Sequence, residues 1–167
     1  MHIRPEAEAD RAAIHAVNKA AFGTSVEGDL VDALRAKAAQ LISLVAEIDE
    51  EIVGHILFSR VSLAEQSERS IMGLGPMSVL PKHQRQGVGS ALVREGLKRC
   101  KQMGCQAVVV VGHPEYYPRF GFVPASRYGI RCEYDVPDDV FMIVELVAGN
   151  LQGASGLIRY DEAFGNA

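Results

Sequence analysis

The sequence lacks an excess of basic residues. Lysine and arginine total 17 and aspartate and glutamate total 21, so the formal net charge is −4 at pH 7. Proteins that bind nucleic acid usually carry a basic patch that neutralises phosphates. We therefore expect no nucleic-acid partner, and an anionic ligand would have to be held by local features of the chain.

The sequence also lacks segments that would indicate a membrane, secreted or metal-binding protein. No apolar run is long enough to span a bilayer, and residues 1–5 do not open a basic-then-apolar signal segment. The three cysteines, Cys100, Cys105 and Cys132, form no CxxC pair, and no set of histidines and cysteines has the spacing of a metal site. We expect a cytoplasmic protein with reduced thiols, no metal and no membrane contact.

The order of apolar patterns predicts a single domain of mixed α/β structure over residues 1–167. Strands are expected at residues 2–5, 43–48, 52–62, 71–80, 107–111 and 141–147, and helices at residues 10–22, 27–39, 87–103 and, as a short turn, 114–119. Proline cannot donate to a sheet, so the fourth strand should abandon its pairing at Pro76. Gly104 suits the end of the long helix, and the apolar residues after Gly149 should pack.

A loop with two glycines joins the fourth strand to the long helix. Gly87 and Gly89 allow backbone N–H groups to approach a ligand with no Cβ atom in the way. The first turn of the following helix has unpaired N–H groups and partial positive charge, and Arg85 can add a charged contact. No lysine follows the glycines, which excludes a Walker A loop, and the third glycine of a dinucleotide fingerprint is missing. The pattern predicts a phosphate or pyrophosphate site.

Two motifs resemble those of the GNAT superfamily of N-acetyltransferases. Residues 84–89, Gln-Arg-Gln-Gly-Val-Gly, are similar to its Q/R-x-x-G-x-G/A signature, which holds the pyrophosphate of acetyl-coenzyme A. Residues 116–122 look like its Y-x-x-x-G-F element. Residues 54–59, 74–76 and 116–125 look most like the YhbS-type group of predicted bacterial acetyltransferases. The resemblance implies an α/β fold with a mostly antiparallel central sheet and helices on both faces.

The resemblance also implies where acetyl-CoA binds. The residues expected to contact it lie on the strand end, the loop, the helix start and the tyrosine turn: Met77, Ser78, Val79, Arg85, Gln86, Gly87, Val88, Gly89, Ser90, Tyr116 and Arg119. The backbone from Met77 to Val79 should bond to the acetyl carbonyl and the pantetheine amides. The side chains of Met77 and Val79 could instead belong to the core, which does not conflict with a backbone role. Tyr116 could serve packing, and Arg119 could be a solvated surface residue.

The resemblance makes Tyr117 the expected proton donor to the departing thiolate. A phenol with a pKa near 10 stays protonated at neutral pH and can donate. For the base that relays the amine proton, Glu27, Glu47, His55 and His113 are all candidates. His55 lies between apolar residues of a strand and could instead be a buried structural group.

The resemblance implies direct transfer of an acetyl group from acetyl-CoA to an amine within a ternary complex. The expected acceptor is an amine of a small molecule, with a protein or peptide amine as the alternative. A non-catalytic acyl-CoA-binding module is the alternative from another functional class, and Tyr117 favours the enzyme because a pure binder does not need it. A homodimer is a further expectation.

Overall fold

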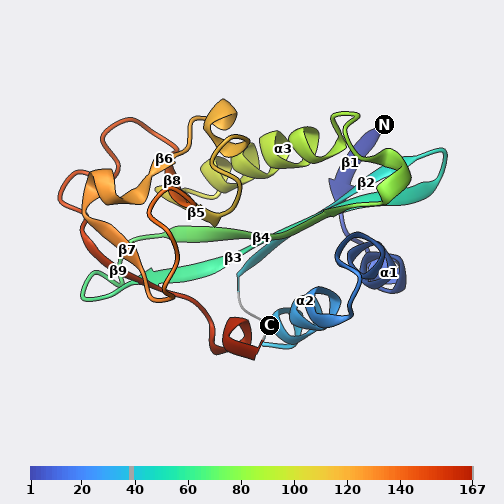
Figure 1. The fold of residues 1–167 in the computed structure, drawn as a ribbon, viewed down its shortest axis with the longest axis horizontal. Helices are drawn as coiled ribbons and strands as arrows, with labels where there is room; N and C mark the ends of the chain where they lie inside the picture. Colours follow the sequence, from blue (N-terminus) through green and yellow to red (C-terminus); the bar gives the residue numbers. More distant parts are fainter. Residues whose placement is uncertain (38–39, 167) are drawn as a thin grey trace. The chain divides into compact units, whose positions relative to one another are not determined.

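Residues 1–37 and 40–166 of the chain are described by a computed structural model (Figure 1). The structure divides into two units. The first contains residues 1–59, 75–96 and the chain end from residue 162, and the second contains residues 60–74 and 97–161. No helix in the described part of the chain is both long and apolar enough to cross a membrane.

The first unit contains a sheet built from the N-terminal strands. Its strands are β1 (His2–Pro5), β2 (Leu41–Ile48), most of β3 (Glu51–Leu63) and the second half of β4 (Ile71–Val79), in this spatial order. β1, β2 and β3 pair antiparallel. Val45 lies opposite His55 and Ala46 lies opposite Gly54. Because successive residues of a strand point to opposite faces, His55 and Gly54 face different sides of the sheet.

Helices cover both faces of the sheet in the first unit (Figure 1). They are α1 (Arg11–Phe22), α2 (Val26–Ala36) and the first turns of α3 (Val88–Gln102), with 3-10 turns at Glu8–Asp10, Pro81–His83 and Glu162–Asn166. On one face α1 and α2 pack on the sheet through a buried cluster of Ile14, Leu30, Val31, Leu34, Val45 and Leu57. On the other face α3 begins directly over β3, because a Cβ on Gly54 would lie 2.9 Å from the Val88 side chain.

The second unit contains the remaining strands. They are the first half of β4, β5 (Ala107–Val111), β6 (Val123–Pro124), β7 (Ile130–Cys132), β8 (Phe141–Glu145), β9 (Gly156–Arg159) and the end of β3, with 3-10 turns at Tyr117–Phe120 and Ala125–Tyr128. β5 is parallel to β4 and antiparallel to β8, which also pairs with β6. β9 is antiparallel to β3 and parallel to β7. A core that includes Val109, Ile143 and Ile158 holds this unit together.

Two helices end at glycines in the left-handed conformation. Gly23 closes α1 with φ = 81°, and its N–H donates to Lys19 O at 2.8 Å. Gly104 follows α3 with φ = 84°, and its N–H donates to Lys101 O at 3.0 Å. Glycine adopts this conformation without the strain that a Cβ atom would introduce. The expected end of the long helix at Gly104 is confirmed.

The expected mixed α/β class with a mostly antiparallel sheet is confirmed, and most elements begin or end within a few residues of their predicted bounds. β1 and β5 match theirs. The helix predicted to reach residue 39 ends at Ala36 in the structure, and residues 38–39 lie outside the described part of the chain. The short turn expected at 114–119 forms as a 3-10 turn at Tyr117–Phe120.

Besides the two-residue β6, two strands, β7 and β9, are absent from the strands expected from the sequence. Each is only three or four residues long and follows or begins with a glycine, so neither shows the alternation by which a strand is recognised. Each forms by pairing with the other, and β9 also pairs with the end of β3. The packing expected for the tail is confirmed at Ile158, which is fully buried in the core of the second unit.

Candidate functional site

The pairing between β4 and β5 ends where the sequence predicts. The parallel register runs from Ile71 opposite Ala107 to Leu74 opposite Val110. Gly75 and Pro76 follow, and Pro76 has no N–H to donate. The strand nevertheless continues to Val79, so its last residues extend beyond the register with β5.

Ser78 is the one residue in this part of β4 with a buried polar side chain that has no partner among the described residues. Its side chain is 3% exposed, and its Oγ makes no hydrogen bond there. Met77 and Val79 are half-buried. A buried hydroxyl is normally paired, so Ser78 Oγ is left for a polar atom of water or of a ligand.

The loop after β4 is braced by its own glutamine side chains. Gln84 Nε2 donates to Val79 O at 3.0 Å, and Gln86 Nε2 donates to Lys82 O at 3.2 Å. Arg85, between them, has φ = 62°, a left-handed conformation that is uncommon for a residue with a Cβ atom. Its side chain is exposed. The two glutamine side chains therefore stabilise the turn. The Arg85 guanidinium is the positive group of this loop that lies nearest in sequence to the start of α3.

The start of α3 has the geometry of an anion site. Gly87 has φ = 85°, and a Cβ atom placed on it would meet nothing within 4 Å, so open space lies in front of it. The first hydrogen bond of the helix runs from Ala91 N to Gly87 O at 3.0 Å. The N–H groups of Val88 and Gly89 precede that bond and have no carbonyl one turn back to pair with. Partial positive charge therefore gathers at the open side of Gly87.

Tyr117 lies in the second unit with its ring buried and with no hydrogen bond from its hydroxyl to any residue that the structure describes. The residue is 7% exposed, and its ring makes edge-to-face contacts with Tyr116 and Phe122 at centroid distances of 5.0 Å and 5.6 Å. No described residue accepts from or donates to its hydroxyl. Burial, with a smaller contribution from Tyr116, raises the pKa of Tyr117 to about 12. The phenol is therefore protonated at neutral pH and able to donate a hydrogen bond.

Tyr116 and Arg119 form a stacked pair at the surface beside Tyr117. The Arg119 guanidinium carbon lies 4.4 Å from the centre of the Tyr116 ring, and Arg119 Nε donates to Tyr116 O at 2.8 Å. Arg119 is exposed. The pair keeps a positive group at this surface. Its geometry is compatible with a phosphate contact by Arg119 and also with a purely structural role for both residues.

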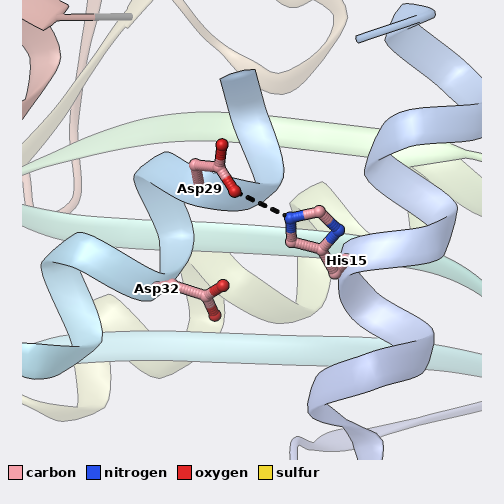
Figure 2. A group of neighbouring side chains, drawn as sticks. All are labelled: His15, Asp29 and Asp32. Carbon is pink, nitrogen blue, oxygen red and sulfur yellow. Dashed lines mark hydrogen bonds and ion pairs between the residues drawn. The ribbon is translucent and has the colours of Figure 1, made fainter. Parts of the chain in front are cut away.

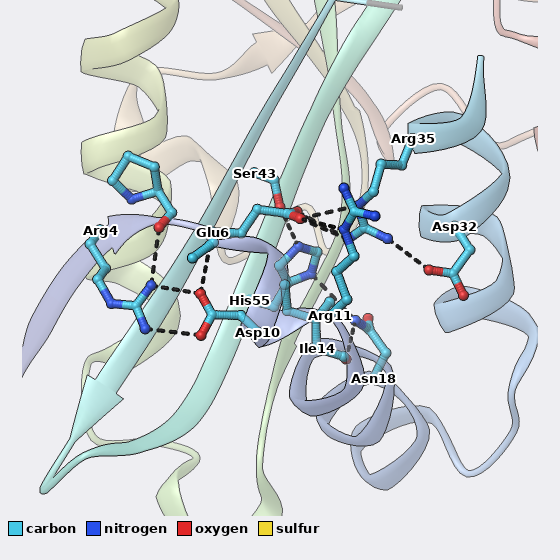
Figure 3. A network of polar contacts seen from close by, with 12 residues as sticks. Arg4, Glu6, Asp10, Arg11, Ile14, Asn18, Asp32, Arg35, Ser43 and His55 are labelled. Carbon is cyan, nitrogen blue, oxygen red and sulfur yellow. Dashed lines mark hydrogen bonds and ion pairs between the residues drawn. The ribbon is translucent and has the colours of Figure 1, made fainter. Parts of the chain in front are cut away.

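His55 lies within a polar network on the face of the sheet covered by α1 and α2 (Figure 3). It is 0% exposed. Asn18 Nδ2 donates to Ile14 O at 3.0 Å and lies 3.3 Å from His55 Nδ1. His55 Nε2 lies 2.9 Å from Ser43 Oγ. Ser43 in turn hydrogen-bonds to the Glu6 carboxylate, which accepts two bonds from Arg35 at 3.0 Å and 3.1 Å.

The network assigns the tautomer of His55 and occupies both ring nitrogens. Because Asn18 Nδ2 is a donor, His55 Nδ1 accepts, and the ring proton belongs on Nε2, which donates to Ser43 Oγ. Burial is the main cause that lowers the pKa of His55 to about 4. His55 also faces away from the side of the sheet on which α3 begins. This arrangement argues against the catalytic role that we predicted for His55 and favours the structural alternative.

The other candidate bases lie on different elements and differ in exposure and in hydrogen-bond or ion-pair partners. Glu27, in the first turn of α2, is half-buried and accepts a hydrogen bond from Thr24 Oγ1 at 3.2 Å. Glu47 faces Arg4 at 3.5 Å. His113 is exposed and follows β5 in the second unit. Among the described residues, Glu47 is engaged by Arg4 and both ring nitrogens of His55 are engaged by Asn18 and Ser43, whereas Glu27 and His113 have no charged partner.

His15, Asp29 and Asp32 bring three possible metal ligands within 4.8 Å of one another (Figure 2). His15 Nε2 lies 2.9 Å from Asp29 Oδ1, and Asp32 Oδ1 accepts from Arg35 at 2.7 Å. A guanidinium bound to Asp32 competes with any cation there. The His15–Asp29 bond between α1 and α2 and the Asp32–Arg35 bond within α2 account for the grouping, so we assign no metal to it.

The chain matches the model of the acetyltransferase (GNAT) family over residues 11–122. This range includes the extended end of β4, the loop, α3 and the Tyr117 turn. The chain belongs to the GNAT family of acetyltransferases.

Relatives of this GNAT chain are found in Escherichia coli. The uncharacterized N-acetyltransferase YjhQ of strain K12 is 40% identical over 136 residues, which cover 79% of this chain and 75% of YjhQ. The uncharacterized N-acetyltransferase YhbS of the same strain is 34% identical over 165 residues, which cover 98% of each chain. The resemblance to the YhbS-type group is therefore confirmed.

Two solved structures share the fold over almost the whole chain. The crystal structure of YhbS from Escherichia coli in complex with CoA aligns with a TM-score of 0.93 at 33% identity and covers 98% of this chain and 91% of that one. A GNAT family acetyltransferase from Brucella melitensis, in complex with acetyl-CoA, aligns with a TM-score of 0.82 at 37% identity and covers 98% and 97% of the two chains. The fold of this GNAT chain is thereby established.

Sequence reasoning missed the residues that support the candidate site. Asn18 sets the tautomer of His55, and Gly112 provides the space for the Tyr117 ring, since a Cβ atom there would lie 2.3 Å from Tyr117 Cε2. Gly112 follows a buried strand and precedes the tyrosine turn, which is a signal that could have indicated a close approach. Asn18 carries no such signal, because its partner is 37 residues away.

Proposed function

We propose that this protein is an acetyl-CoA-dependent N-acetyltransferase that transfers the acetyl group directly to an amine of a small molecule in a ternary complex. Acetyl-CoA is the cosubstrate of the family to which the chain belongs. The observation that carries the proposal is the start of α3, where Gly87 opens onto free space and the Arg85 turn precedes the Val88 and Gly89 amides, which come before the first hydrogen bond of the helix. The pyrophosphate would bind to these amides and to Arg85.

The pantetheine arm and the thioester would bind along the extended end of β4. The N–H groups of this segment are the donors that we assign to the carbonyl oxygen, on which negative charge develops during attack by the amine. Ser78 Oγ, which is buried and unpaired within the described chain, is a further polar group on this segment. Backbone donors suit the task because they are held in place by the strand and do not reorganise during the reaction.

We propose Tyr117 as the donor to the departing sulfur. A thiol has a reference pKa near 8.5, and Tyr117 has a pKa of about 12 in the free protein. Complete proton transfer from this phenol to a thiolate would therefore be uphill before the ligands bind. Hydrogen-bond donation to the sulfur needs no complete transfer, and it stabilises the negative charge that develops on the departing thiolate. For the base we retain Glu27, with His113 as the alternative.

The experiment that tests the proposal is an acetylation assay with a panel of amines. Release of free CoA thiol from acetyl-CoA should depend on an added amine, and mass spectrometry should detect the acetylated product. A protein that binds acetyl-CoA but acetylates neither small amines nor peptide amines would be a binding module. Acetylation of peptides alone would move the acceptor class to proteins.

We further propose that residues 1–167 act as a single acetyltransferase domain. YhbS, which is a GNAT acetyltransferase of comparable length, aligns with 98% of the chain, and the family match extends through both units. Each unit is assembled from separate stretches of the chain, so a truncation that removes residues 97–167 would take segments from both units and should abolish acetyl transfer.

A further inference from the structure

The second unit contains a pocket that none of the acyl-donor residues lines. Its volume is about 310 Å³, near the lower end of the range for small-molecule sites. The walls come from the segment that runs from the turn before β7 to the start of β8. Ile130, Val136 and Phe141 supply apolar surface, so the site is a pocket with mixed walls and not merely a group of acidic residues.

The charged groups of this pocket are unbalanced. Glu133, Asp135 and Asp138 line it together with one arginine, Arg131, so three carboxylates face one guanidinium and a charge of −2 remains. Asp135 and Asp138 have no ion-pair or hydrogen-bond partner in the described part of the chain. One oxygen of Glu133 accepts from the Tyr160 amide. A cation that entered the pocket would therefore meet carboxylates that no protein cation already holds.

The aromatic residue in the wall also suits a cation. Tyr134 lines the pocket and is 37% exposed, and its ring packs at 5.7 Å from that of Tyr160. An exposed aromatic face attracts ammonium groups through its quadrupole, and the apolar surface beside it accommodates the carbon chain of an organic ligand. An inorganic metal ion would use neither feature.

We propose that this pocket binds an ammonium group of the acceptor and that the acceptor carries at least two amino groups. Carboxylates favour the protonated form of a bound amine, and a protonated amine has no lone pair with which to attack a thioester. The nitrogen held in the pocket is therefore an anchor, and a second nitrogen of the same molecule is acetylated. The assignment of the anchored molecule as the acceptor rests on the acetyltransferase function proposed above.

The first test measures binding without acetyl-CoA. In ¹H–¹⁵N spectra, 1,5-diaminopentane should shift amides between residues 131 and 138, whereas 1,5-pentanediol, of similar size and without charge, should not. The double variant Asp135→Asn/Asp138→Asn should lose these shifts. Asp139→Asn is the matched control, because Asp139 is also exposed and is adjacent to Asp138 but does not line the pocket. Equal shifts with the diol, no shifts with the diamine, or equal effects of the two variants would overturn the proposal.

The second test measures turnover and separates the two proposals. Wild type should prefer 1,5-diaminopentane over 5-amino-1-pentanol, and the double variant should raise the KM for the diamine by about three- to tenfold at unchanged kcat, as expected for exposed ion pairs. If the diamine binds in the pocket but no amine is acetylated, the pocket stands and the enzymatic function falls. If amines are acetylated with no preference for the diamine and no change of KM in the double variant, the function stands and the pocket proposal falls.

Discussion

The ring of Tyr117 occupies the space that a Cβ atom on Gly112 would need. That Cβ would lie 2.3 Å from Tyr117 Cε2, a distance that real contacts do not reach. The Gly112 N–H donates to Val140 O at 3.0 Å, which ties this backbone to its neighbour and limits its movement. Glycine is therefore required at position 112 by the position of the tyrosine.

We expect Gly112→Ala to lower the free energy of unfolding by about 1–3 kcal/mol, because an added methyl group in a packed site forces its neighbours to move. The same substitution in a Tyr117→Ala background should cost much less, because the ring that it strikes is gone. Urea unfolding of the four proteins in a double-mutant cycle measures this coupling. Additive losses would show that the clash is relieved elsewhere.

We expect Tyr117→Phe to lower kcat by about 10²- to 10⁴-fold, the range for loss of a general acid, with little change in the Kd for CoA. Its hydroxyl makes no hydrogen bond within the described chain, so the stability should be almost unchanged. Steady-state kinetics with an accepted amine checks the rate, and Tyr116→Phe is the control because that residue contacts Tyr117 by its ring edge. A wild-type rate in Tyr117→Phe would remove the hydroxyl from the mechanism.

We expect Gly87→Ala to weaken CoA binding by at least about tenfold, which corresponds to roughly 1.4 kcal/mol. A Cβ atom would enter the open space in front of the helix amides and would also strain a backbone with φ = 85°. Gly104→Ala is the matched control, since Gly104 has φ = 84° and open surroundings at the other end of α3. Both variants should lose about 1–2 kcal/mol of stability, and calorimetry should find weaker binding in Gly87→Ala alone. Equal affinities would mean that the phosphates bind elsewhere.

We expect the stability of the fold to fall between about pH 6.5 and pH 4 because of His55. Its pKa is lowered from 6.5 to about 4 in the folded state, so the unfolded state binds the extra proton in this range. The stabilisation is complete above pH 6.5, and the loss should be on the order of 1 kcal/mol per pH unit below it. Urea unfolding at several pH values measures the slope.

The control for the pH dependence is His55→Gln, which cannot titrate and retains a donor and an acceptor at the end of its side chain. Its stability should be lower than that of wild type at pH 7 and flatter with pH from 6.5 to 4. The Glu6 carboxylate, whose pKa is lowered by its hydrogen bonds to Arg35 and Ser43, should add a separate loss at lower pH. Identical slopes for wild type and His55→Gln would assign the effect to other groups.

The local features of the candidate site could be predicted because residues close in sequence form them. Gly87 lies directly before α3 and Gly89 is the second residue of that helix, and Pro76 follows the last paired residues of the strand that contains it. Glycine and proline change the backbone only at and next to their own positions, so residue types and their spacing are enough to predict these features. The turn that contains Tyr117 was likewise indicated by its own proline and glycine.

The role of His55 could not be predicted from its neighbours in the sequence. The sequence shows a histidine between apolar residues, which is compatible with a base and with a buried structural group. The choice depends on Asn18 and Ser43, which come from α1 and β2 and approach His55 only in the folded chain. Burial and the direction of a hydrogen bond are properties of that arrangement, and no pattern within β3 encodes them.

The sequence by itself determined the family, through the resemblance of its two motifs, and the mixed α/β class, through short-range periodicity. It also predicted a place where an anion would bind, because glycines before a helix start act locally. The tertiary structure decided which polar residues are engaged with one another, why Gly112 must be glycine, and that β7 and β9 are strands. It also arranged the residues between 131 and 138 around a pocket. These properties depend on contacts between distant segments, whose energies are set by packing and burial and do not exist in the unfolded chain.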